Sequence, residues 1–232
     1  MNYNWKKIWV SAGQVTFSAN LESYMGRTAW HFTGNGTTFS KYDWIYKVRD
    51  KYESYCDTSS LKPLRFLRDV HEGGNYYYDD HVFSYTKKRI YSTMQKGKKL
   101  VKDSVAIAPC TYDVMTAVYA ARGIDFSLHK YNDTIPLVLM LENKIYKVHI
   151  RFIGREEKKV EGLGTFKCIK FKPLLIEGTL FKGGEEMTVW VSDDKNKVPV
   201  YIETPILVGW IKVNLRSYKN LKYPLSSMVK LN

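Results

Sequence analysis

The stretch from Phe171 to Leu215 constrains the fold most, because its apolar residues alternate with polar ones over consecutive short segments. One face of its first segment carries Met187, Val189 and Val191, and one face of the next carries Val198, Val200 and Ile202. Such alternation is typical of half-buried β-strands. Turn-forming residues at Gly183-Gly184 precede the first segment, those from Ser192 to Lys197 separate it from the next, and a third segment begins near Gly209. The stretch therefore predicts consecutive antiparallel strands joined by tight turns.

The rest of the chain follows the same rule. We expect further strands at residues 7–10, 15–21, 28–32, 49–56, 64–71, 75–85, 88–94, 100–107, 135–142, 145–153 and 166–171. Turns are predicted at Gly34-Asn35-Gly36, Gly73-Gly74, Asp79-Asp80, Lys96-Gly97-Lys98 and Asn143-Lys144. Residues 39–48 fit a short helix. The segment 135–142 is apolar throughout, which predicts a central strand covered on both faces.

The most convincing helix lies near residues 111–122 and follows Pro109. Thr111 or Asp113 is a suitable N-cap, and Gly123 is a natural stop. This helix is the expected cover of the central strand. The sequence thus predicts a mainly β fold, a curved antiparallel meander covered by one main helix, with residues 1–232 forming a single domain.

The chain carries a net charge of +13 and has a pI near 9.4. A positive field favours anionic partners but does not distinguish nucleic acid, acidic polysaccharide and lipid headgroups. Cations concentrate where a hairpin tip is expected, at Lys87, Lys88, Arg89, Lys96, Lys98, Lys99 and Lys102. These residues are either the solvated end of a hairpin or an anion-contacting surface. We expect no nucleic-acid partner.

Known catalytic and metal-binding motifs are absent from the sequence. Cys110 precedes the predicted helix, where the helix dipole lowers a thiol pKa, so a hydrolase using it as nucleophile is one hypothesis. The same hypothesis considers Asp193-Asp194 as paired carboxylates, but their place between two alternating strands strongly favours a plain turn. Asp79-Asp80-His81 lacks the further ligands of a closed metal site. We therefore expect a non-enzymatic protein without metal or cofactor.

The three cysteines, Cys56, Cys110 and Cys168, have no metal-binding or redox spacing. Cys56 could pair with either of the others in an oxidising compartment, and all three could instead be small apolar core residues. The sequence leaves these alternatives open.

Aromatic residues are abundant, with 18 Tyr and 6 Trp. Side chains alternate along a strand, so Tyr77 points away from Tyr76 and Tyr78. Core packing explains most such residues. A concave sheet lined by aromatic rings would instead hold a lipid chain or sugar rings. The candidate ligand-binding residues are Trp30, Trp44, Tyr76, Tyr78 and Trp210.

Several segments together resemble a family of bacterial exported proteins, domain of unknown function 3108. They are Ala12-Gly13 with the alternation after it, Tyr52-Glu53-Ser54 leading to Pro63, the helix from Asp113 to Arg122, and Val189 to Asp194 leading to Val198-Pro199-Val200. The resemblance implies a periplasmic or otherwise exported protein whose leader is absent from this chain. It also implies an open half-barrel similar to that of lipoprotein carriers.

The resulting hypothesis is a cell-envelope protein, favoured as a monomer, that binds a lipid or lipoprotein chain, or another hydrophobic or amphipathic ligand, without catalysis. One alternative is a module that docks on a protein or an anionic envelope surface through the predicted hairpin cations. The hydrolase is the other alternative.

Overall fold

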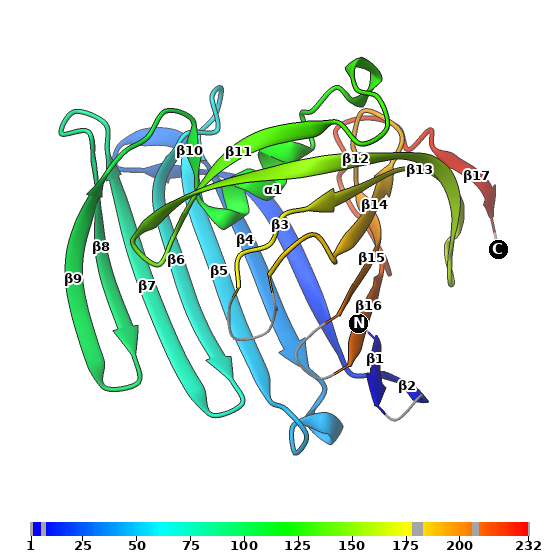
Figure 1. Ribbon diagram of the computed structural model, residues 1–232, viewed down its shortest axis with the longest axis horizontal. Helices are drawn as coiled ribbons and strands as arrows, with labels where there is room; N and C mark the ends of the chain where they lie inside the picture. The colour runs from blue at the N-terminus through cyan, green and yellow to red at the C-terminus, as the bar shows by residue number, and fades with distance from the viewer. Residues whose placement is uncertain (1, 6–7, 178–182, 206–208, 232) are drawn as a thin grey trace. The chain divides into compact units, whose positions relative to one another are not determined.

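The computed structural model describes residues 2–5, 8–177, 183–205 and 209–231 (Figure 1). The chain forms two compact units. The first unit comprises residues 1–11, 122–136 and 148–232, and the second unit comprises residues 12–121 and 137–147. Two strands, β11 (Thr134–Leu141) and β12 (Lys144–Val160), each begin in one unit and end in the other.

The second unit contains a seven-stranded antiparallel meander in which each strand pairs with the next along the chain. Its strands are β3 (Gly13–Tyr24), β4 (Arg27–Thr38), β5 (Val48–Asp57), β6 (Pro63–Glu72), β7 (Asn75–Ser84), β8 (Arg89–Lys96) and β9 (Lys99–Ala106). Figure 1 shows that this sheet is curved. Its order begins at β3 and ends at β9, so the sheet is open. The predicted curved antiparallel meander is confirmed.

The one α-helix among the described residues is α1 (Val114–Ala121), which packs against β4 and β5. Asp113 caps it, because its Oδ1 accepts a hydrogen bond of 2.9 Å from the backbone N–H of Thr116. The other oxygen, Oδ2, accepts a hydrogen bond of 2.6 Å from Ser54 Oγ on β5. The predicted helix and its cap are confirmed, and the cap also ties the helix to the sheet.

Gly34-Asn35-Gly36 was predicted as a turn, and that prediction is wrong. These residues lie inside β4, and the β3–β4 hairpin turns instead at Met25 and Gly26, which both have positive φ. A Cβ on Gly34 would lie 3.3 Å from both Met115 Sδ and Phe17 Cε1. Glycine is therefore needed here for the close approach of α1, which a local turn signal does not distinguish.

Two other local predictions need correction. Asp79-Asp80 is not a turn, because both residues lie inside β7 and their side chains pair with arginines on opposite faces of the sheet. The expected short helix at 39–48 is reduced to a single 3₁₀ turn, Ser40–Tyr42. The turns at Gly73-Gly74 and Gly97 are confirmed by their positive φ values.

The core of the second unit lies between the sheet and α1. We call this side of the sheet the inner face. Its buried residues are Phe32, Cys56, Phe66, Phe83, Ile90, Met115 and Met140. The ring of Tyr119 stacks on that of Phe32 with a centroid distance of 3.7 Å. Met140 comes from the β11–β12 hairpin, so this hairpin contributes to the core.

The first unit contains the predicted C-terminal meander, which is confirmed. Its strands are β1 (Asn2–Trp5), β2 (Ile8–Ser11), most of β12, β13 (Gly164–Pro173), β14 (Thr188–Ser192), β15 (Pro199–Pro205), β16 (Trp210–Asn214) and β17 (Met228–Leu231). Antiparallel pairing runs from β12 to β16, and β16 then pairs with β1. A buried cluster of Val160, Phe166, Cys168, Trp190, Val200 and Tyr201 lies on this sheet. Residue 7 of the predicted strand 7–10, and residues 178–182 and 206–208 of the predicted stretch 171–215, lie outside the described residues.

The expectation for the segment 135–142 is only partly met. It forms β11, but β11 has the two-residue strand β10 (Thr111–Tyr112) as its parallel neighbour at the end of the sheet order. The strand is therefore not central, and α1 packs on β4 and β5 instead. The hairpin turn uses Glu142 and Asn143, both with positive φ, one residue before the predicted pair. No helix in the described part of the chain has the length and apolar character needed to span a bilayer.

Candidate binding pocket on the inner face

Four of the five aromatic residues predicted to line one cavity belong to the second unit, and these four do not lie on one face of its sheet. Trp30 packs on the inner-face core, whereas Tyr76 and Tyr78 lie on the opposite, outer face of the same sheet. Trp44 lies in the loop before β5 and is 76% exposed, and Trp210 belongs to β16 of the first unit. Of this set, only Trp30 belongs to the inner-face core of the second unit.

The residues of the predicted cationic surface form two separate groups. Lys87 and Lys88 lie in the turn before β8, which begins at Arg89, whereas Lys96 ends β8, Lys98 lies in the next turn and Lys99 begins β9. Strands rise about 3.3 Å per residue, so the two groups are separated by roughly 23 Å. The prediction that they flank one hairpin tip is wrong, because the turn at residues 85–88 and the turn at Gly97 are at opposite ends of the strand.

The group at the end of β8 borders a pocket of about 270 Å³. The lining residues are Arg68, Tyr77, Asp79, Met94, Gln95, Lys96, Lys99, Val101 and Glu142. The strand register creates this grouping, because Asp79 pairs with Met94, which pairs with Val101, and Tyr77 pairs with Lys96, which pairs with Lys99. Residues from four strands and the β11–β12 turn therefore converge within the second unit.

Arg68 forms the charged floor of the pocket, with its side chain only 13% exposed. Its Nε lies 2.7 Å from Asp79 Oδ2, and its Nη2 donates to Glu142 Oε1 at 3.2 Å. Burial acts against the charged guanidinium, yet the Asp79 and Glu142 carboxylates raise the pKa of Arg68 above its ordinary value. Burial also raises the pKa of Asp79, and Arg68 opposes that change. Arg68 therefore keeps its positive charge at neutral pH.

Lysines and apolar groups form the walls of the pocket. Lys96 Nζ lies 5.3 Å from the ring centroid of Tyr77, and the guanidinium carbon of Arg68 lies 5.7 Å from the same centroid. Two cations thus contact one aromatic ring. Met94 and Val101 supply apolar surface beside them. The arrangement suits a ligand that has both a negative group and an apolar part.

A pair of carboxyl groups, Asp50 on β5 and Glu72 on β6, lies on the same inner face as Arg68. Burial, and then the charge and hydrogen bond of Glu72, raise the pKa of Asp50 to about 7. Glu72 is itself buried, with 5% of its surface exposed. Burial and the neighbouring Glu72 both disfavour the charged form of Asp50. Asp50 therefore adds less negative charge to the inner face than an ordinary aspartate would.

His81 and Ser92 form a contact that superficially resembles a catalytic dyad. His81 Nδ1 lies 2.8 Å from Ser92 Oγ, but Ser92 Oγ donates to Asn143 Oδ1 at 2.9 Å. Asn143 in turn donates to Asp103 Oδ2 at 2.7 Å. Burial lowers the pKa of His81 to about 4, and Ser92 is 3% exposed. Ser92 is inaccessible to a substrate, so this network has a structural role and joins the β11–β12 turn to β7, β8 and β9.

The residues of the hydrolase hypothesis belong to different units. Cys110 is exposed in the second unit, while Asp193 and Asp194 lie in the β14–β15 turn of the first unit. Asp193 accepts from Arg155 at 3.1 Å, and Asp194 accepts backbone N–H groups of its own turn. The described residues contain no group of three or more His, Cys, Asp or Glu side chains arranged to hold a metal ion. Cys56 and Cys168 are buried free thiols, and burial raises the pKa of each to about 12.

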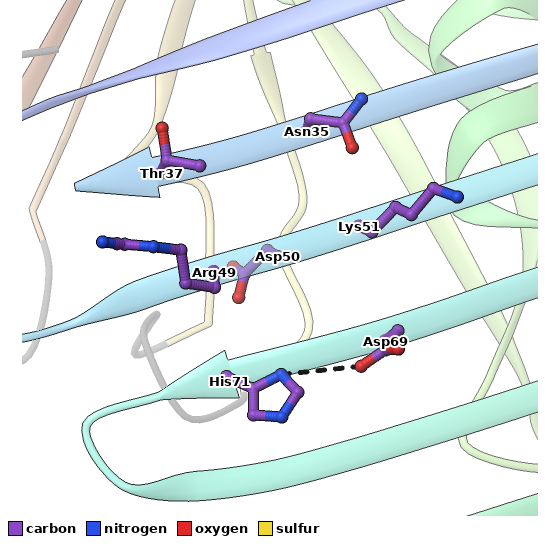
Figure 2. A pocket seen from close by; sticks show the side chains of 7 residues that line it. All are labelled: Asn35, Thr37, Arg49, Asp50, Lys51, Asp69 and His71. Atoms are coloured by element: carbon purple, nitrogen blue, oxygen red, sulfur yellow. Dashed lines mark ion pairs between the residues drawn. The ribbon is translucent and has the colours of Figure 1, made fainter. Parts of the chain in front are cut away.

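A second pocket, of about 240 Å³, lies over β4, β5 and β6 (Figure 2). Its lining residues are Asn35, Thr37, Arg49, Asp50, Lys51, Asp69 and His71. Arg49 is already engaged by Asp43, with Nη2 2.6 Å from Oδ2, and by the backbone carbonyl of Thr38. His71 Nδ1 lies 3.5 Å from Asp69 Oδ1. This polar surface offers few unengaged groups, and we regard the inner-face pocket as the stronger candidate.

Sequence reasoning identified Lys96 and Lys99 but missed Arg68, Tyr77 and Asp79 as a group. A partial signal was present, because Arg68 has the same strand parity as the buried Phe66 and Val70. An arginine on the apolar face of a strand requires a buried partner. Its partner, Asp79, is identified only by the β6–β7 register.

Comparison with known proteins supports the resemblance found in the sequence. The model of a family described as "Protein of unknown function (DUF3108)" matches residues 1–216. A crystal structure of a β-barrel-like protein of domain of unknown function DUF1849 from Brucella abortus has a similar fold, with a TM-score of 0.54 and 9% identity. The match covers 89% of this chain and 88% of that chain, and it agrees with the predicted open half-barrel. No functionally curated protein matches the sequence.

Proposed function

The chain belongs to the DUF3108 family of proteins of unknown function, and from this premise we propose that it is a non-enzymatic binding protein of the bacterial cell envelope. In this proposal, the inner-face pocket of the second unit takes an anionic amphiphile. The negative group of the ligand lies near Arg68, Lys96 and Lys99, and its apolar part contacts Met94 and Val101.

The observation that carries the proposal is the combination of charge and apolar surface in one pocket. Three cations, Arg68, Lys96 and Lys99, face two carboxylates, Asp79 and Glu142, so the lining has an excess of one positive charge. Arg68 is engaged by the two carboxylates, whereas neither lysine forms an ion pair within the described residues. The excess charge is therefore on the two lysines at the rim, where a ligand would meet it first.

The pocket volume limits the ligand. Ligand sites in proteins usually measure about 300–1,000 Å³, and this pocket, at about 270 Å³, falls just below that range. It suits a medium-chain carboxylate or the headgroup of a larger lipid. We therefore choose octanoate as the probe, with octylamine and octanol as charge controls of equal chain length.

The test is isothermal titration calorimetry of the purified protein with the three probes. We expect octanoate to bind in a saturable manner, and octylamine not to bind. Exposed charge pairs contribute about 0.2–1 kcal/mol each, so the Lys96→Gln/Lys99→Gln variant should bind octanoate roughly tenfold more weakly. The matched control is Lys87→Gln/Lys88→Gln, which removes the same charge at the other end of β8 and should leave affinity unchanged.

Two results would overturn this proposal. One is the absence of saturable octanoate binding by the wild-type protein. The other is an equal loss of affinity in both double variants, which would show that net charge rather than this pocket determines binding. The envelope location derives from the family resemblance and has a separate test. Cell fractionation of the native host should place the protein in the envelope, and native mass spectrometry before and after organic extraction should detect a removable ligand.

A further inference from the structure

We propose that the edge strand β3 is a self-association surface, and that two copies of this chain pair antiparallel through β3 about a twofold axis at Ser18. The inference is independent of the pocket and departs from the monomer that the sequence favoured. Its starting point is that β3 is the end strand of the seven-stranded sheet. An end strand has backbone N–H and C=O groups pointing away from its neighbour, which makes it a template for another strand.

The edge of β3 lacks the usual protections against such pairing. Its twelve residues, Gly13–Tyr24, contain no lysine, arginine or proline, and they pair with β4 in one unbroken register without a bulge. Natural edge strands are generally protected by these features or by shortness. The opposite edge, β9, is protected in this way, because it carries Lys99, Lys102 and Asp103 over eight residues.

The side chains of β3 add an apolar surface to this edge. Val15, Phe17 and Leu21 lie on the inner-face side and are 41%, 52% and 57% exposed. Within the described residues, β3 pairs only with β4. The hydroxyl of Tyr119 donates to the carbonyl oxygen of Ser18 at 3.1 Å, and this carbonyl belongs to the row that faces β4, because Ala12 in the same row accepts from the backbone N–H of Phe39. A carbonyl oxygen has two lone pairs and can accept a second hydrogen bond.

The sequence of β3 favours a second copy of itself as the partner. In an antiparallel pair centred on Ser18, Val15 lies opposite Leu21 and Phe17 lies opposite Ala19, so apolar residues meet on one face. On the other face, Gln14 lies opposite Glu22, and Thr16 lies opposite Asn20. The single charged residue of the strand, Glu22, therefore never faces its own copy. Cross-strand pairs of this kind stabilise sheets, and a twofold axis gives a closed dimer.

The first test is the oligomeric state of the wild-type protein and two variants by sedimentation velocity over a concentration series. Leu21→Lys introduces a charge into the proposed interface, once in each copy, and should weaken dimerisation roughly a hundredfold, about tenfold per copy. Leu100→Lys is the matched control, because Leu100 is also 57% exposed and lies on the other edge strand. It should leave dimerisation unchanged.

A second test examines the register and does not depend on a charged substitution. In a Cys110→Ser background, which removes the exposed native thiol, Ser18→Cys should form a disulfide between copies on mild oxidation. Directly opposed residues lie about 4.5–5.5 Å apart at Cα, within the range for a disulfide. Thr16→Cys should not cross-link, because its two copies would lie about 14 Å apart along the strands.

The expected outcome is a wild-type dimer that Leu21→Lys weakens and Leu100→Lys does not, with cross-linking through position 18 only. A wild-type monomer at every concentration would overturn the proposal. So would a dimer that is insensitive to Leu21→Lys, or equal cross-linking at positions 16 and 18. Circular dichroism of each variant shows whether it has folded, and the cysteine pair remains decisive should the lysine variant fail to fold.

Discussion

Replacing Arg68 with methionine should destabilise the protein in a strongly pH-dependent manner. Methionine fills much of the space of the arginine stem, so the main effect is that the Asp79 carboxylate, 4% exposed, loses its partner. Breaking a buried ion pair from one side costs about 3–5 kcal/mol. The loss of the Glu142 contact adds little, because Glu142 is 57% exposed and solvent screens it.

Protonation of Asp79 limits this cost, and the limit depends on pH. Neutralising a carboxyl whose ordinary pKa is 3.8 costs about 5 kcal/mol at about pH 7.5 but only about 1.5 kcal/mol at about pH 5. The stability deficit of Arg68→Met should therefore shrink from about 3–5 kcal/mol to about 1.5 kcal/mol or less as the pH falls. The measurement is urea unfolding at both pH values, followed by far-ultraviolet circular dichroism.

Two controls make this test decisive. The double variant Arg68→Met/Asp79→Leu removes both charges and should recover most of the lost stability. Arg65→Met breaks the bidentate pair with Asp80 on the outer face, where Arg65 is 35% exposed, and should cost about 1 kcal/mol or less. Equal losses for Arg68→Met and Arg65→Met would refute the reasoning, as would a deficit that does not change with pH.

Three further predictions can be checked by the same unfolding measurements. Gly34→Ala should cost about 1–3 kcal/mol through overpacking against α1, whereas Gly36→Ala, whose new Cβ would have no neighbour closer than 3.7 Å, should be neutral or slightly stabilising. Asp113→Ala should cost about 2–4 kcal/mol, since it removes a helix cap and leaves the buried hydroxyl of Ser54 without its acceptor. The control is Asp125, an exposed residue that caps the 3₁₀ turn Phe126–Leu128 by accepting from the backbone N–H of Ser127, and Asp125→Ala should cost less than about 1 kcal/mol. The raised pKa of Asp50 means that the folded state holds this proton more tightly, so the contribution of Asp50 to stability is present below about pH 4 and is lost as the pH rises towards about 7. Asp50→Asn should remove that part of the pH dependence, and an unchanged pH profile would contradict the assignment.

Local sequence signals identified most strands and the helix because those elements depend on nearby residues. The alternation from Val15 to Leu21 predicted β3, and Asp113 predicted the start of α1. The same signals failed at Gly34 because glycine is compatible both with a turn and with close packing. The contact that distinguishes the two, with Met115, is eighty-one residues away along the chain.

The residues of the binding pocket were harder to predict from the sequence for a similar reason. Lys96 and Lys99 were recognised as part of a basic cluster, but they were assigned to a single tip together with Lys87 and Lys88. Placing the two groups at opposite ends of β8 requires the strand boundaries. Joining Lys96 to Arg68 requires, in addition, the register of two hairpins. Neither property is encoded in any one segment.

The pairing of β1 with β16 has a consequence for the synthesis of this protein. Asn2 lies opposite Lys212, so β1 has no β16 to pair with until more than two hundred further residues have been made. At about 5–20 residues per second, that interval lasts roughly 10–40 s. The seven-strand meander contains only neighbouring pairs and can form during this time. The β1–β2 hairpin therefore lacks its β16 neighbour until nearly all of these residues have been made, and the first unit can be completed only after β16.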